Sequence, residues 1–254
     1  MRFQVLGCSG SIGDNCDTTA FLVDDDILID AGTGLGSLSL EALTGIDHVF
    51  LSHSHMDHIA LLPMLVDATL SLRDKPIIVH ASTDVLNTLS NHIFNWDVYP
   101  DFRKINSVGH AGLKFSAMEA EKPVMLGERC LRAIPVEHSV PTVAYHLDSG
   151  AGSLVVASDM TVSDQFWPIV NGIDNLRYLL IETAFQNARA DLCAITGHLC
   201  PTLLGEELQR LERPVEIYVT HMKPSAKEQI RREIGELPAN LDLHILSSSD
   251  ILEI

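Results

Sequence analysis

The segment Ser52-His53-Ser54-His55-Met56-Asp57-His58 places four potential metal ligands within six positions. The segment begins at the end of a short apolar run, residues 48–52, and this run predicts a β-strand. His53 and His55 are two residues apart, so in an extended segment both imidazoles point the same way. Asp57 and His58 then open a helix-like stretch at 59–72 and can face a second ion. Imidazole and carboxylate groups are good zinc ligands, so this spacing predicts a metal site; the alternative is a surface turn in which Asp57 caps the helix.

The pattern H-x-H-x-D-H after a short apolar strand resembles the hallmark of the metallo-β-lactamase superfamily. The resemblance implies an α+β fold, a four-layer αββα sandwich with a dinuclear metal site at one sheet edge. We therefore expect residues 1–254 to form a single hydrolase domain of this type. Two zinc ions are the expected cofactors, and manganese or iron is the alternative because His and Asp sites also take these metals.

The resemblance also implies ligands further along the chain, and candidates stand in the expected order at the ends of apolar strands. They are His138, Asp159 and His221, after the runs 130–136, 153–157 and 217–220. The implied set is His53, His55 and His138 for one ion, Asp57, His58 and His221 for the other, and Asp159 as the bridge.

Asp30, in Leu28-Ile29-Asp30-Ala31-Gly32, matches an acid that lies behind the metal loop in this superfamily. There it would hold a ligand by a hydrogen bond. A turn acid at the end of a strand is an equal alternative.

Apolar runs along the rest of the chain agree with two packed sheets. Strands are expected at 2–6, 19–23, 27–30, 48–52, 77–80, 114–118, 124–126, 130–136, 142–147, 153–157, 178–182 and 217–220, and helices at 38–43, 59–72, 83–94, 164–170, 202–211 and 227–236. Each sheet has an apolar face that needs cover. Two sheets packed face to face with helices outside satisfy that need.

Three further segments narrow the resemblance to the class II cyclic-nucleotide phosphodiesterases. They are GHLCP at 197–201, THMKP at 220–224, and HIFNW at 92–96 leading to PDF at 100–102. The chain departs from the class at Met56, where Leu is usual, and at Leu61, where a small residue is usual. A larger side chain at position 61 must repack the helix behind the metals.

Phosphodiester cleavage needs charge neutralisation, an activated water and a proton for the leaving oxygen. Two metals supply the first two. His198 is the candidate proton donor because it lies in a loop and no metal position is left for it. Glu182 could orient His198 and raise its pKa, and Asp57 is counted as both ligand and catalytic residue. The alternatives are a strand-end role for Glu182 and a helix cap for His198.

An aromatic loop follows the helix expected at 83–94, in a chain with only 6% aromatic residues. Phe94, Asn95 and Trp96 are the predicted substrate contacts there, because nucleobases stack on aromatic rings. Packing of the loop as a lid is the alternative. Lys223 could reach a phosphate, with a solvated lysine as its alternative.

The charge balance, 17 basic against 34 acidic residues, gives a formal net charge of −17. Such a chain repels polyanions, so long nucleic acid is a poor partner. Five cysteines without a C-x-x-C spacing predict free thiols in a reducing compartment. We find no signal peptide or membrane span and expect a soluble cytoplasmic protein. A homodimer is possible, and the aromatic loop could serve its interface.

The leading functional prediction is an enzyme that hydrolyses a 3′,5′-cyclic nucleotide, cAMP or cGMP, to the 5′-monophosphate. A tRNA 3′-processing ribonuclease shares the metal plan, but it usually carries a basic, Gly-rich arm that we do not find. A thioester or lactone hydrolase would not require His198 and Glu182. A non-catalytic binding module would have lost ligands, whereas all seven candidates are present.

Overall fold

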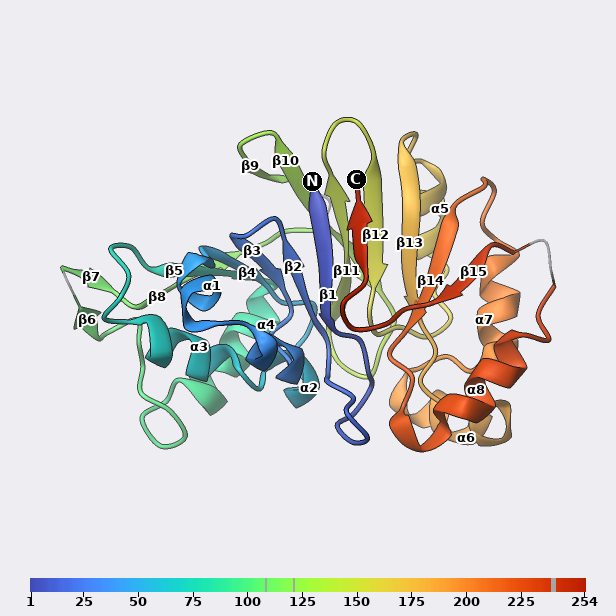
Figure 1. The fold of residues 1–254 in the computed structure, drawn as a ribbon, viewed down its shortest axis with the longest axis horizontal. Helices are drawn as coiled ribbons and strands as arrows, with labels where there is room; N and C mark the ends of the chain where they lie inside the picture. Colours follow the sequence, from blue (N-terminus) through green and yellow to red (C-terminus); the bar gives the residue numbers. More distant parts are fainter. Residues whose placement is uncertain (108, 121, 239–240) are drawn as a thin grey trace.

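The computed structural model describes residues 1–107, 109–120, 122–238 and 241–254. Over these residues the chain forms two seven-stranded sheets, with helices on their outer faces (Figure 1). The predicted α+β sandwich is therefore confirmed. The first sheet has the order β16 (Ile251–Glu253), β1 (Arg2–Gly7), β2 (Ala20–Val23), β3 (Ile27–Ile29), β4 (His48–Phe50), β5 (Ile77–Ala81) and β8 (Leu113–Ala117). The second has the order β15 (Leu243–Ile245), β14 (Glu216–Thr220), β13 (Leu176–Glu182), β12 (Ser153–Ala157), β11 (Thr142–Asp148), β10 (Arg129–Val136) and β9 (Val124–Leu126).

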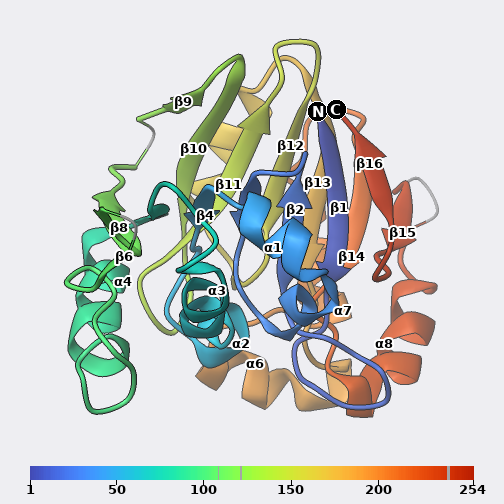
Figure 2. The ribbon, with the colours of Figure 1, turned by 60° about the vertical axis from the view of Figure 1, so that its left-hand side comes forward.

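The helices divide between the two halves of the sandwich (Figure 2). The first half carries α1 (Leu40–Gly45), α2 (Met56–Ile59), α3 (Leu62–Thr69), α4 (Thr83–Thr88) and the π-helical turn η2 (Leu89–Ile93). The second carries α5 (Phe166–Asn171), α6 (Ala190–Thr196), α7 (Pro201–Leu208) and α8 (Lys227–Ile234). Short 3₁₀ turns are η1 (Thr33–Ser37), η3 (Asn187–Arg189) and η4 (Pro224–Ala226), and β6 (Asn106–Ser107) and β7 (His110–Ala111) form a separate small ribbon.

Alternating side chains build the layers of the core. In β1, Phe3 and Val5 point between the sheets, where they join Leu131 and Tyr145 from the second sheet. Residues on the opposite faces pack under helices, for example Leu28 beneath α3 and Ile217 among the helices of the second half. A helix has only one apolar stripe to bury, whereas each sheet here has two apolar faces. Helices therefore form the outer layers, and the order of layers is helix, sheet, sheet, helix.

The two ends of the chain lie side by side in the first sheet (Figure 1). β1 pairs antiparallel with β16, and the amino group of Met1 donates to the carbonyl of Ile254 at 3.0 Å. The last strand thus returns from the second half to complete the sheet of the first half. No helix in the described ranges is long and apolar enough to cross a bilayer.

Two predicted helices differ from the structure. The helix expected at 59–72 is two pieces, α2 and α3, because the chain turns at Leu61 and Pro63 opens the next helix. The helix expected at 83–94 changes after Thr88 into the π-helical turn η2. Short elements that the pattern did not predict are β6, β7, α6, β15 and β16.

Strand direction determines where the polar residues gather. β3 and β4 run parallel, as do β12, β13 and β14. β10 runs in the same direction as β12, because both are antiparallel to β11. The carboxyl ends of parallel strands meet at one edge of a sheet, and the segments that follow these strands carry the polar cluster described next.

Candidate metal centre

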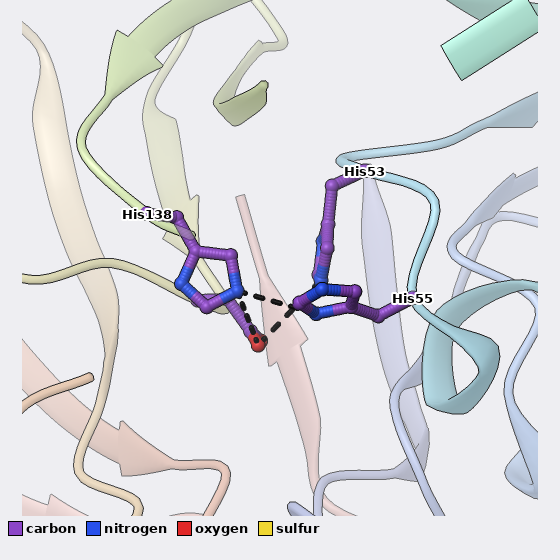
Figure 3. A group of neighbouring side chains, drawn as sticks. His53, His55 and His138 are labelled. Atoms are coloured by element: carbon purple, nitrogen blue, oxygen red, sulfur yellow. Dashed lines mark hydrogen bonds and ion pairs between the residues drawn. The ribbon is translucent and has the colours of Figure 1, made fainter. Parts of the chain in front are cut away.

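Four predicted ligands form one cluster at the edge where the two sheets meet. His53 and His55 come from the segment after β4, His138 follows β10, and Asp159 follows β12. One ligand atom from each residue lies within 4.8 Å of the others. Figure 3 shows the imidazoles of His53, His55 and His138 directed toward one another. Nε2 of His138 is 3.3 Å from Nδ1 of His55.

A second cluster adjoins the first and consists of Asp57, His58 and His221. Oδ2 of Asp57 lies 3.8 Å from Nε2 of His58 and 3.8 Å from Nε2 of His221. Asp159 lies between the clusters: its Oδ1 is 3.0 Å from His58 Nε2, and its Oδ2 is 3.7 Å from His53 Nε2. All seven predicted ligand side chains therefore converge, in two groups joined by Asp159.

The surroundings fix which nitrogen of each imidazole faces the centre. Ser52 Oγ donates its proton to Asp30 Oδ2 at 2.8 Å, so it must accept from His53 Nδ1 at 3.0 Å. Nδ1 of His58 donates to Asp30 Oδ2 at 2.7 Å, and Nδ1 of His138 donates to the carbonyl of Gly197 at 2.7 Å. In all three histidines Nδ1 carries a proton and Nε2 faces the centre; in His53 and His138 the environment favours the neutral ring, so the lone pair of Nε2 points into the centre.

Unpartnered atoms show that the centre fits a cation. Nε2 of His53 and Nε2 of His221 are buried, and neither has a hydrogen-bond partner among the residues that the structure describes. Buried polar atoms are normally satisfied, so an orphaned group of lone pairs needs an explanation. A histidine and aspartate set of this kind suits zinc, manganese or iron.

Protonation states agree with this fit. Burial lowers the pKa of His53, His55 and His138, and it lowers that of His221 to about 3. Burial also opposes a charge on His58, but the carboxylates of Asp159 and Asp30 raise its pKa well above the usual range. Metal binding requires neutral imidazoles, and the environment of most of these histidines favours that form.

Strained backbone occurs at two residues of the centre. Asp30 has φ of 56° and His221 has φ of 62°, both in the left-handed region that is costly outside glycine. His221 is packed so closely that a Cβ atom on Gly10 would lie 2.9 Å from its Cδ2. Glycine is therefore required at position 10, in the turn after β1.

His198 and Glu182 form a buried pair beside the centre. Nδ1 of His198 donates to Oε1 of Glu182 at 2.7 Å, and the same imidazole lies 3.9 Å from Asp159 Oδ2. Backbone N–H groups of Met160 and Leu199 also donate to Glu182, which fixes its carboxylate. Burial disfavours the imidazolium form of His198, but the charge and hydrogen bond of Glu182 raise its pKa.

The predicted substrate residues have different surroundings. Phe94 is 1% exposed and belongs to the core beneath the first sheet, whereas Trp96 is 58% exposed. Oδ1 of Asn95 accepts from the N–H groups of Asp97 and Val98, so Asn95 shapes the turn that presents Trp96 with φ of 72°. Lys223 Nζ donates to the carbonyl of Gly10 at 2.8 Å, which places its ammonium beside the turn behind His221.

The two departures from the class pattern leave the ligand cluster intact. Met56 is exposed at the first position of α2. Leu61 packs against the core of the first half, and its Cδ1 faces the open side of Gly36. The larger residue at position 61 is thus accommodated in the core of the first half.

Sequence reasoning missed several groups that support the ligands. Ser52 Oγ and the carbonyl of Gly197 fix the tautomers of His53 and His138, and Thr19 Oγ1 lies 3.4 Å from His221 Nδ1. Ser52 could have been noticed because it precedes His53. A backbone carbonyl such as that of Gly197 gives no residue-type signal.

Comparison with known families agrees with this site. The model of the β-lactamase superfamily domain matches residues 25–222, which include all seven candidate ligands. This chain belongs to the β-lactamase superfamily. Membership establishes a metallo-β-lactamase fold and a hydrolase superfamily, which hosts many reactions.

Among curated relatives, a probable 3′,5′-cyclic-nucleotide phosphodiesterase of Yersinia pestis is 26% identical over 79% of this chain and 64% of its own length. A 3′,5′-cyclic-nucleotide phosphodiesterase of Aliivibrio fischeri is 26% identical over 87% of this chain and 81% of its own length. Ribonuclease Z of Haloarcula marismortui is 28% identical over 58% of this chain and 47% of its own length. This chain thus aligns with just under two thirds of the Yersinia protein and about half of the ribonuclease.

Solved structures support the fold. Unliganded yeast PDE1 superposes with a TM-score of 0.80 at 17% identity, over 96% of each chain. The metallo-β-lactamase fold protein YhfI from Bacillus subtilis superposes with a TM-score of 0.77 at 20% identity, over 99% of this chain and 98% of its own.

Proposed function

We propose that this protein is a dinuclear-metal phosphodiesterase that hydrolyses a 3′,5′-cyclic nucleotide to the 5′-monophosphate. The observation that carries the proposal is the buried Glu182–His198 pair beside the seven-ligand centre, since a phosphodiester with an alkoxide leaving group needs a proton donor. Two curated relatives named 3′,5′-cyclic-nucleotide phosphodiesterases support the substrate class.

The ligand groups would hold two cations in this proposal, preferentially zinc. His53, His55 and His138 serve one position, Asp57, His58 and His221 serve the other, and Asp159 serves both. When bound, such ions activate water and neutralise the phosphate oxygens. Asp57 is 28% exposed, the most open of the carboxylates at the centre, and its free oxygen can orient the attacking water.

His198 would donate a proton to the leaving 3′ oxygen. Its Nδ1 proton is committed to Glu182, so the transferable proton is on Nε2 of the imidazolium. Glu182 acts as a positioning residue: it holds the ring orientation and stabilises the positive charge before transfer. Burial opposes the charge, but Glu182 raises the pKa of His198 and so favours the protonated form that a donor needs.

Substrate recognition is assigned to the loop that carries Trp96 and to Lys223. Trp96 offers a free aromatic face for the nucleobase, while Asn95 and buried Phe94 hold the loop that presents it. Lys223 carries a positive charge next to His221 and can approach a phosphate oxygen after releasing the carbonyl of Gly10. Base stacking on one aromatic ring contributes about 1–3 kcal/mol in nucleic-acid systems.

A tRNA-processing ribonuclease is the competing proposal, favoured by the similarity to ribonuclease Z. The formal net charge of −17 disfavours it, because binding of a polyanion depends on neutralising many phosphates with basic residues.

A substrate panel separates the two proposals. The zinc-loaded protein is assayed with cAMP, cGMP, an aryl phosphodiester and a precursor tRNA. We expect turnover of at least one cyclic nucleotide and none of the precursor. Turnover of the aryl ester alone would preserve the metal chemistry and reject cyclic nucleotides as substrates. Cleavage of the precursor at its 3′ end would replace our proposal with the ribonuclease.

A further inference from the structure

A small cavity lies on the outer face of the second sheet, set back from the metal centre. Its volume is about 150 Å³, and its walls include Arg132 and Ile134 of β10, His146 of β11, and Ile169 and Ile173 in and after α5. Arg132 pairs with His146 across the two strands, so both side chains leave the sheet on the same face. This cavity shares no residue with the metal centre.

His146 is the unusual member of this cavity. It is 4% exposed, and its Nε2 atom has no hydrogen-bond partner within the described ranges. The surrounding face is apolar: Ala144 lies two residues away on β11, and Val155 is the paired residue on β12. An unsatisfied buried nitrogen is costly unless something binds there. Burial also lowers the pKa of His146, so the ring is neutral and offers an N–H group as donor.

Arg132 supplies a positive charge at the mouth of the cavity. Its side chain is exposed, and among the described residues no hydrogen bond or ion pair involves its guanidinium. Asp148 lies two residues from His146 on the same strand, but its Oδ1 accepts from Gly150 N and Asn175 Nδ2, both at 2.8 Å. The cavity therefore combines one free cation, one free imidazole and three isoleucine walls.

We propose that this cavity binds a small monocarboxylate whose hydrocarbon part is a short branched chain or a single ring. The carboxylate would pair with Arg132 and accept the N–H of His146, and the hydrocarbon would pack against Ile134, Ile169 and Ile173. An apolar cavity of about 150 Å³ accommodates benzene, so one six-membered ring is the appropriate size. Inorganic phosphate fits less well, because it brings no apolar body to the isoleucine walls.

Calorimetric titration of the metal-loaded protein with benzoate and with isovalerate tests this site. Benzamide, which lacks the charge, and acetate, which lacks the hydrocarbon, are the ligand controls. We expect one site with a Kd of about 1 mM or tighter, which suits ligands of about seven to nine non-hydrogen atoms. Benzamide and acetate should each bind at least about tenfold more weakly.

Variants locate the binding. Arg132→Gln changes an exposed side chain and should weaken benzoate at least about tenfold, as should His146→Gln or His146→Leu. Arg177→Gln, which changes an exposed arginine on β13 of the same sheet, is the matched control and should bind normally. Undiminished binding in the Arg132 and His146 variants would place the carboxylate at the metal centre and overturn the proposal. Absence of saturation at about 20 mM, well above the expected Kd, would also overturn it. Catalytic turnover does not enter the measurement, so failure here is distinguishable from failure of the proposed function.

Discussion

Nδ1 of His198 lies 2.7 Å from Oε1 of Glu182, and both side chains are buried next to Asp159. Glu182 also accepts two backbone N–H groups, so its position is fixed independently of His198. A histidine held in this way is oriented by its neighbour, whose charge raises the pKa of the imidazole. In the proposed mechanism this pair supplies the proton for the leaving oxygen, and the metal ions are held by the other residues.

His198→Gln should retain both metal ions and lose about 10²–10⁴-fold in kcat on a cyclic nucleotide, the range for loss of a positioned acid. Glu182→Gln should lose less, because His198 remains in place. Metal content by plasma mass spectrometry and steady-state rates check both statements. An aryl phosphodiester is the control substrate: its leaving group needs no proton, so His198→Gln should hydrolyse it at close to the wild-type rate. Equal losses on both substrates would remove His198 from the donor role.

Asp30→Asn should lower metal affinity about 10–100-fold, the usual effect of losing a group that orients a ligand. Asp30 accepts from His58 Nδ1 and from both the N–H and the hydroxyl of Ser52, and an amide cannot accept all three. Competition with a chelator of known affinity gives the dissociation constant of the metal. Asp25→Asn, an exposed acid of the same hairpin, is the matched control. Equal affinities for the two variants would contradict the orienting role of Asp30.

Trp96→Ala should raise KM for the cyclic nucleotide about tenfold and leave kcat nearly unchanged, because stacking on one ring contributes about 1–3 kcal/mol to binding. The comparison is Val98→Ala, which removes another exposed apolar side chain from the same loop. Michaelis–Menten kinetics of the two variants give the KM and kcat values to be compared. A fall in kcat with unchanged KM would argue against a role for Trp96 in base binding.

His80 should make the folded protein sensitive to mild acid. Burial lowers the pKa of His80 from 6.5 to about 4, and Nδ1 of His48 lies 2.9 Å from its Nε2. Below pH 6.5 the unfolded chain therefore binds a proton that the folded chain does not bind, and stability falls as the pH drops toward 4. Between pH 7 and pH 5 the free energy of unfolding falls by about 1–2 kcal/mol, since each pKa unit corresponds to about 1.4 kcal/mol.

Urea unfolding at the two pH values measures this contribution. His80→Phe, which preserves the stacking on Phe50, should have a smaller acid-induced loss than wild type. His92→Asn, at an exposed histidine, should have the same loss as wild type. We expect acid release of metal to affect all three proteins equally. The difference between them in the acid-induced loss of stability then reports the contribution of His80. Identical pH dependence in wild type and His80→Phe would show that this histidine does not control acid stability.

The predictable part of this fold is the part that periodicity and residue type encode. A strand such as β12 is a nearly continuous apolar run because both faces are buried, and the candidate ligand Asp159 follows this run closely. Short strands could not be predicted, since β15 and β16 have three residues each and are defined by partners far away in the chain.

The same limit applies to the centre. The residue types of the candidate ligands and of His198 are visible in the sequence, whereas most of the contacts that orient them involve neighbours remote in the chain. The carbonyl of Gly197 reaches His138 across 59 positions, and Gly197 itself needs φ of 74° to do so. The break at Leu61 was also hidden, because it depends on a backbone hydrogen bond from Leu61 to Ala31.

The regiochemistry of cAMP hydrolysis tests the central claim most directly. Zinc-loaded protein is incubated with cAMP, and the product is identified by chromatography against 5′-AMP and 3′-AMP standards. Protonation of the 3′ oxygen by His198 predicts 5′-AMP as the product, with turnover lost on chelation and restored by added metal. Formation of 3′-AMP, or no turnover of cAMP or cGMP by protein that holds two metal ions, would contradict the account.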